Sequence, residues 1–197
     1  MIRNFSKMAL VVAVALSIGA CAKPPVEALE AARVALDAAQ AGEADRYVSD
    51  LYLAAADSFS LAQTEIETQN AKSAFTRNYD HAASLLTYVS ETAAAAQAQV
   101  AERKEAVRVA NETLFTEVDA AIASANDLMK KAPRGKDGAA ALAQIRADLD
   151  LVGPALEEAR AAQAAGDFIR ARDVAQSAIE RVNGLIAELN TAIEAAK

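Results

Sequence analysis

Few residues of this chain have side chains that could do chemistry. Its 197 residues include one His, His81, and one Cys, Cys21. No Asp or Glu lies three or four positions from His81, so a helix would give this imidazole neither a metal-binding partner nor an orienting acid. Glycine-rich phosphate loops and Gly-x-Ser-x-Gly nucleophile motifs do not occur. The sequence therefore predicts no catalytic residue, no metal site and no cofactor, and we do not expect an enzyme.

Pairs of acidic residues occur at four places in the sequence. They are Glu27 with Glu30, Glu65 with Glu67, Asp148 with Asp150, and Glu157 with Glu158. Two carboxylates can act as general acid and base, or bind a divalent cation. Each pair stands among other polar residues, so we interpret all four as solvated helix surface.

One cluster of basic residues stands out in this acidic chain. It consists of Lys130, Lys131, Arg134 and Lys136. Cations at the end of a helix stabilise its dipole by about 0.3–1 kcal/mol each, which is the structural interpretation. The functional alternative is contact with an anionic partner, such as a cell-wall polymer or a lipid headgroup.

Six aromatic residues gather in the first half of the chain. They are Tyr47, Tyr52, Phe59, Phe75, Tyr79 and Tyr88. An alanine-rich helical core needs some bulky side chains to fill space, so we predict that they belong to the core. The alternative is a groove for a partner helix, lined by Tyr47, Tyr52, Tyr79 and Tyr88.

The N-terminal segment has the organisation of a secretory signal. Arg3 and Lys7 precede an apolar run from Met8 to Ile18, which is too short to span a bilayer. The run ends in Ile18, Gly19, Ala20 and Cys21, which resembles the lipobox of bacterial lipoproteins. The resemblance implies that residues 1–20 are a cleaved signal peptide and that Cys21 carries acyl chains such as palmitate. The alternative is an ordinary secretory signal followed by an incidental Cys.

The residues after Cys21 bear on location. In enterobacterial lipoproteins an Asp at this position favours the inner membrane, so Ala22 implies the periplasmic side of the outer membrane. Residues 21–25, with Pro24 and Pro25, form a tether whose last four residues reach at most about 14 Å. Without Arg3 and Lys7 the net charge falls from −7 to −9. Such a chain offers no electrostatic footprint for nucleic acid, so its membrane attachment must come from the lipid.

Composition and spacing predict an all-α fold. Alanine, the best helix former, is the most frequent residue, and only seven Gly and four Pro interrupt the chain. Apolar residues at three- and four-residue spacing predict five helices. Their ranges are 25–41, 49–76, about 80–132, about 138–165 with a kink at Gly153-Pro154, and from Asp167 to near residue 192. A restart of the long third helix at Asn111 is the alternative to continuity.

The helix lengths suggest antiparallel hairpins that share the long helix. We predict a first helical module over residues 26–105 and a second over residues 106–197, with a single folded-back bundle as the alternative. Asn78-Tyr79 and Asp167-Phe168 each place a cap before an aromatic residue, with Ala three residues after the aromatic. This pattern resembles the turns of tetratricopeptide-type repeats, although no repeat period is sustained.

The order of features over residues 20–110 also resembles a family of small Gram-negative envelope lipoproteins. That family has a lipidated Cys, a Pro-rich spacer, an Ala-rich helix, a Tyr-Ala-Pro helix start and a Gly-Asp-Tyr-type turn. The matching segments here are Pro24-Pro25, Glu27–Ala41, Tyr47-Val48-Ser49 and Asn78-Tyr79. The resemblance implies an all-helical domain with an envelope role and an association with peptidoglycan-binding proteins.

These observations together predict a membrane-anchored lipoprotein. We expect a structural or protein-interaction scaffold in the bacterial envelope, with another envelope protein, a second copy of the chain or peptidoglycan as partner. The alternative is a helical binding module whose groove takes a specific peptide or a hydrophobic ligand.

Overall fold

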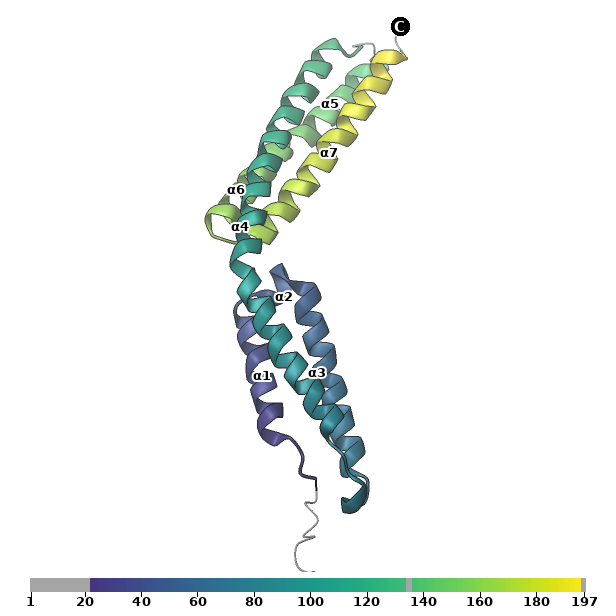
Figure 1. Ribbon diagram of the computed structural model, residues 1–197. Helices are drawn as coiled ribbons and strands as arrows, with labels where there is room; N and C mark the ends of the chain where they lie inside the picture. The colour runs from purple at the N-terminus through teal and green to yellow at the C-terminus, as the bar shows by residue number, and fades with distance from the viewer. Residues whose placement is uncertain (1–21, 134–135, 196–197) are drawn as a thin grey trace, which may run out of the picture. The chain divides into compact units, whose positions relative to one another are not determined.

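The computed structural model describes residues 22–133 and 136–195, and this part of the chain contains helices and turns without a strand (Figure 1). This confirms the all-α prediction, including a long central helix that packs against other helices of the chain. The elements are α1 (Val26–Ala41), α2 (Ala44–Tyr47), α3 (Ser49–Asn70), the 3-10 turn η1 (Ala74–Thr76), α4 (Asp80–Lys131), α5 (Lys136–Asp150), α6 (Val152–Ala164) and α7 (Phe168–Glu194).

The chain divides into two compact units, Met1–Ala98 and Gln99–Lys197. Helix α4 contributes residues to both, because it continues without a break through Asn111 for 52 residues. The predicted continuity is therefore confirmed, and no cap restarts the helix at Asn111.

The core of the first unit is built mainly from alanine. Eight alanines have no exposed surface: Ala32, Ala39, Ala44, Ala55, Ala62, Ala82, Ala93 and Ala96. Larger side chains, such as Leu36, Leu86 and Val89, lie between them. On α4 the buried residues follow the predicted stripe from Ala82 to Val100. Small side chains allow the helices to approach closely, so each methyl group makes many contacts although it buries little area.

A short helix that the sequence did not predict joins α1 to α3. Gly42 ends α1, and Glu43 takes a left-handed conformation with φ of 66° before the four residues of α2. Ala44 and Tyr47 of α2 are buried, as is Val48 after it. This turn therefore anchors one end of the first unit.

Helix α3 ends at Asn70, six residues before the predicted end at residue 76. The Arg77 guanidinium donates hydrogen bonds to the carbonyls of Asn70 and Lys72, at 3.0 and 3.1 Å. The Tyr79 hydroxyl donates to Asn70 Oδ1 at 2.6 Å, and Asn78 N–H donates to Gln69 Oε1 at 3.0 Å. The Asn70 carbonyl at the end of α3 thus has a partner outside the helix, so the helix can end there.

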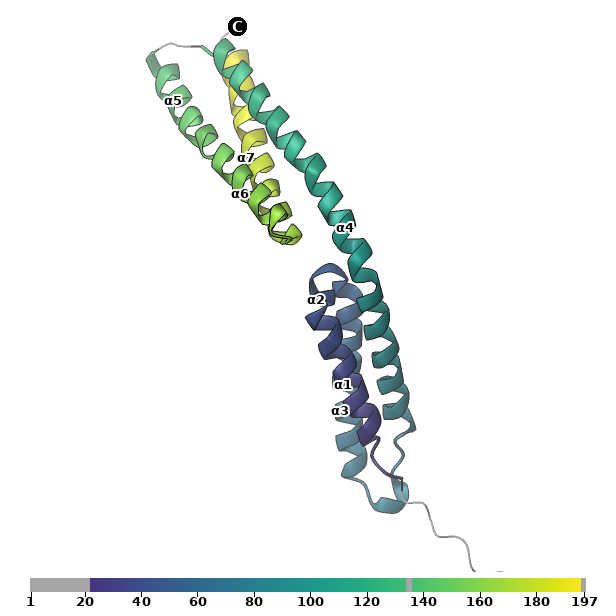
Figure 2. The same cartoon turned by 90° about the vertical axis from the view of Figure 1, so that its left-hand side faces the viewer.

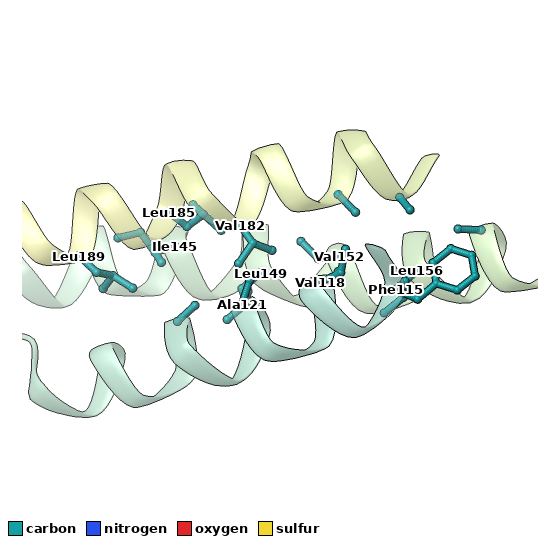
Figure 3. Close-up of a cluster of buried hydrophobic side chains, with 14 of the residues drawn as sticks. Phe115, Val118, Ala121, Ile145, Leu149, Val152, Leu156, Val182, Leu185 and Leu189 are labelled. Atoms are coloured by element: carbon teal, nitrogen blue, oxygen red, sulfur yellow. The ribbon is translucent and has the colours of Figure 1, made fainter. Parts of the chain in front are cut away.

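The second unit packs α4, α5, α6 and α7 around an aliphatic core (Figure 3). Phe115 and Val118 of α4 face Leu156 of α6, while Leu149 of α5 lies beside Val182 of α7. In this unit α4 buries Val118, Ala121 and Ala125 as the stripe predicted. Around residues 110–115 the prediction is wrong, because Asn111 and Phe115 are buried whereas Ala110 is exposed.

Two helices occupy the segment for which one kinked helix was predicted. Helix α5 ends at Asp150 and α6 begins at Val152, two residues before Pro154. Proline in the first turn of a helix removes an N–H that has no partner inside the helix, so it is tolerated there. The ring therefore stands at the start of a new helix, and the predicted interior kink is wrong.

The turn between α6 and α7 follows the prediction at Gly166 and Asp167. Gly166 has φ of +84°, and the Asp167 N–H donates back to the Ala162 carbonyl at 3.0 Å. The Asp167 side chain accepts a hydrogen bond from the Arg170 N–H, as an N-cap does. This hydrogen-bond pattern is a Schellman motif, in which glycine removes the steric cost of a left-handed residue.

Two glycines of this unit should respond to alanine in opposite directions. A Cβ at Gly166 or at Gly184 would meet no atom within 4 Å. Gly166→Ala should lower the free energy of unfolding by about 1–2 kcal/mol, because an L-residue resists positive φ. Gly184→Ala, inside α7, should raise it by about 0.5–1 kcal/mol. Urea denaturation followed by circular dichroism measures both, and a shift of the same sign in the two variants would contradict the assigned conformations.

Candidate functional site

The predicted lipid-attachment segment, Ile18, Gly19, Ala20 and Cys21, lies outside the described residues. The described chain begins with Ala22, and the Val26 N–H donates to the Pro24 carbonyl at 2.9 Å. Helix α1 begins at Val26, as the tether prediction requires. Four residues therefore separate Cys21 from the first helix.

The four tyrosines of the predicted groove lie in different surroundings. Tyr47 and Tyr79 are buried and Tyr52 is half-buried. Tyr88 on α4 is 47% exposed. Tyr47 and Tyr79 fit the interpretation as core residues. Of the four, Tyr88 is the one that is largely exposed to solvent. The groove remains a prediction.

The basic cluster is described only in part. Lys130 and Lys131 lie in the last turn of α4, where their charges complement the helix dipole. Arg134 and the Lys136 side chain lie outside what the structure describes. Lys130 Nζ lies 2.7 Å from Asp127 Oδ1, and this hydrogen bond lowers the pKa of the Asp127 carboxyl. Asp127 therefore stays ionised at neutral pH and offsets the charge of Lys130.

A surface depression of about 480 Å³ lies beside these residues in the second unit. Met129 and Lys130 of α4 line it from one side, and Leu142 and Arg146 of α5 line it from the other. The walls combine apolar carbon with two cationic groups. A ligand that fits this chemistry has an apolar body and an anionic end.

Members of three of the four acidic pairs, Glu65, Asp148, Glu157 and Glu158, take part in ion pairs or hydrogen bonds on helix surfaces. Glu157 binds Arg160 at 2.7 Å, Glu158 binds Arg170 at 2.8 Å, and Asp148 lies 3.4 Å from Arg181. These carboxylates face cations on solvent-exposed helix surfaces, which is not the geometry of a paired acid and base. Each exposed pair contributes about 0–1 kcal/mol. The Glu158–Arg170 pair joins α6 to α7 and the Asp148–Arg181 pair joins α5 to α7, whereas Glu157 and Arg160 both lie on α6.

A buried polar network in the second unit was not predicted. Asn111 of α4 is completely buried, and its Nδ2 donates to Gln163 Oε1 at 2.8 Å and to the Phe168 carbonyl at 2.9 Å. Gln163 in turn donates to the Arg108 carbonyl at 2.9 Å and to Glu112 Oε1 at 3.1 Å. The network fastens the turn between α6 and α7 to α4.

The Asn111 Oδ1 atom is buried and makes no hydrogen bond to another group of the described chain. A buried acceptor without a partner is costly, so the two donated bonds must outweigh this cost. In the sequence the signal is an Asn three residues before Leu114 and seven before Val118, on a face that is otherwise apolar. The sequence-based prediction gives Asn111 a role only in its alternative, as the cap of a restarted helix.

Other chemistry-bearing groups are dispersed. His81 is exposed on the first turn of α4. In the described part of the chain, no three His, Cys, Asp or Glu side chains are arranged to hold a metal ion. Within the described residues, no helix combines the length and the apolar character that are needed to cross a membrane.

Comparison with known proteins identified no matching family model, no matching curated protein and no matching solved structure.

The Asn111 network yields a stability prediction. Asn111→Ala removes the buried donor to Gln163 Oε1 and to the Phe168 carbonyl, and it should lower the free energy of unfolding by about 1–3 kcal/mol. The matched control is Asn126→Ala on the same helix, because Asn126 is exposed and bonds only the Ile122 carbonyl of its own helix. We expect that control to change stability by less than about 0.5 kcal/mol. Thermal and urea unfolding measure both, and equal effects would rule out a special role for the network.

Proposed function

We propose that this protein is a lipid-anchored scaffold on the periplasmic side of the bacterial outer membrane. The observation that carries the proposal is the single Cys of the chain at the cleavage position of a lipobox, four residues before α1. The apolar run before Cys21 is about eleven residues long, which fits a signal-peptide core and not a membrane span.

The properties of the folded part support a scaffold. Each unit has its own core, and charged side chains form ion pairs across the exposed faces of the second unit. An acidic surface is repelled by anionic lipid, so the acyl chains must hold the protein at the membrane. One acyl chain binds only marginally, whereas several chains anchor firmly. Partners in this proposal are an envelope protein, a second copy of the chain or peptidoglycan.

Replacing the lipidated residue tests the anchor. Cys21→Ala should move the protein from the membrane fraction to the soluble fraction of a Gram-negative host, or leave it as an unprocessed precursor with residues 1–20 still attached. Fractionation with immunoblotting and intact mass spectrometry gives the readout. A variant that is cleaved normally and stays in the membrane would refute lipidation at Cys21.

The neighbouring position provides a matched control for location. Ala22→Asp retains Cys21 and should remain membrane-bound, but in an enterobacterial host it should move from the outer to the inner membrane. Density-gradient separation of the two membranes distinguishes these outcomes. If the variant and the unaltered protein were both found in the inner membrane, the outer-membrane assignment would be wrong while the anchor would stand.

A second candidate function is a binding module for an amphipathic ligand. The depression lined by Met129, Lys130, Leu142 and Arg146 favours it. A photoreactive amino acid at Ala143 in this depression, compared with one at Tyr88, distinguishes the two functions in cells. Adducts with protein from Tyr88 support the scaffold, and an adduct of small mass confined to Ala143 supports the binding module.

A further inference from the structure

The connection between α3 and α4 in the first unit, residues 71–79, exposes an aromatic ring. Phe75 is 92% exposed, although an aromatic residue at this position was predicted to belong to the core. Isolated exposed apolar residues are common on protein surfaces and need no explanation by themselves. The position of Phe75 relative to the tether is what makes it informative.

The tether and this connection lie at the same end of the first unit. Figure 1 and Figure 2 both place residues 22–25 beside the connection, because α1 begins at the end where α3 finishes and α4 starts. Val26, the first residue of α1, is 66% exposed at this end as well. Two of the large exposed apolar side chains therefore lie next to the segment that leads to Cys21.

The connection and the tether themselves contain basic residues and no acidic residue, although Glu27 and Asp80 adjoin them. Residues 71–79 contain Lys72 and Arg77 and no acidic residue, in a protein of net charge −7. Together with Lys23 of the tether, they are three of the five basic residues among residues 22–98. Cations beside exposed apolar side chains are the composition of segments that bind the headgroup layer of membranes.

Hydrogen bonds order the backbone of the turn that carries Phe75. The Thr76 N–H donates to the Ser73 carbonyl at 2.9 Å, and the hydroxyls of these residues lie 3.0 Å apart. Arg77 fixes the other side of the connection through the carbonyls of Asn70 and Lys72. The ring is therefore presented by an ordered 3-10 turn.

We propose that Phe75 inserts into the headgroup region of the lipid bilayer that carries the Cys21 anchor. This inference rests on the proposed lipid anchor and adds an orientation to it. Lys23 and Lys72 then lie at the level of anionic headgroups, and the α3–α4 end of the first unit faces the membrane. The acyl chains supply attachment, while Phe75 sets how this unit stands on the surface.

The chain contains no Trp, so a single introduced Trp is an unambiguous fluorescent probe. We would purify the lipidated full-length Phe75→Trp variant and reconstitute it in vesicles of phosphatidylethanolamine and phosphatidylglycerol. Matching vesicles would contain lipids with brominated acyl chains, which quench Trp on contact. The expected result is a blue shift of the emission and its quenching by brominated lipid.

Leu53→Trp is the matched control in the same unit. Leu53 is 57% exposed on α3 and lies 17 residues before Asn70, or about 26 Å along the helix from the end near the tether. That distance exceeds the roughly 5–10 Å depth of the interfacial layer. The indole of the Leu53→Trp variant should emit as a water-exposed group in both kinds of vesicle. Circular dichroism of each variant verifies that the helices are intact.

Each remaining outcome overturns a defined part of the proposal. Vesicle flotation shows whether the chain is anchored, and a chain that does not float refutes the lipid anchor. If the Phe75→Trp chain floats but its emission is unquenched and unshifted, the insertion of Phe75 is refuted and the anchor stands. A blue shift without quenching assigns Phe75 to a protein contact instead. Equal quenching in the Phe75→Trp and Leu53→Trp variants means that the unit lies flat on the bilayer, which contradicts the proposed orientation.

Discussion

The buried face of α4 is the constraint on which the rest of the fold depends. Alanine dominates the core of the first unit, and a buried methyl group contributes only about 0.8 kcal/mol. A hairpin of α1 and α3 alone would bury too little apolar surface to offset the conformational entropy of folding. Ala82, Leu86 and Val89 of α4 complete that core, and Phe115 and Val118 complete the other. One continuous helix therefore supplies both cores, the first through residues 82–100 and the second from Asn111 onward.

Where the core is made of small side chains, polar contacts at the connections determine how the helices end. Arg77 and Tyr79 terminate α3 at Asn70, and Asn111 fastens the α6–α7 turn to α4. These contacts are directional, whereas methyl packing tolerates sliding of one helix along another. Asn111 is therefore the specific element of the second core. A leucine there would bury more apolar area but would leave the Phe168 carbonyl and Gln163 without their donor.

Periodic features could be predicted from the sequence, and features that depend on tertiary contacts could not. The helices, the continuity of α4 and the turn at Gly166 follow from apolar spacing and from glycine and cap preferences, which are local. The end of α3 depends on Arg77, seven residues away from Asn70, and the role of Asn111 depends on residues more than 50 positions later. Pro154 was assigned to a helix interior because the apolar phase continues across the break. Residue type predicts Phe75 in the core, but Phe75 lies in the connection between α3 and α4 and is exposed there.

Such exposure has a cost that bears on function. An aromatic ring held in water by an ordered turn gives up the free energy that burial would provide, and it increases the tendency to associate. The bonds of Ser73, Thr76 and Arg77 order the backbone of the turn around Phe75, and in this turn the ring lies in solvent. The first unit thus combines a core of small side chains with a nearly fully exposed Phe75, next to the segment that leads to Cys21. Insertion of the Phe75 ring into the bilayer, as proposed, would provide the burial that the folded unit does not.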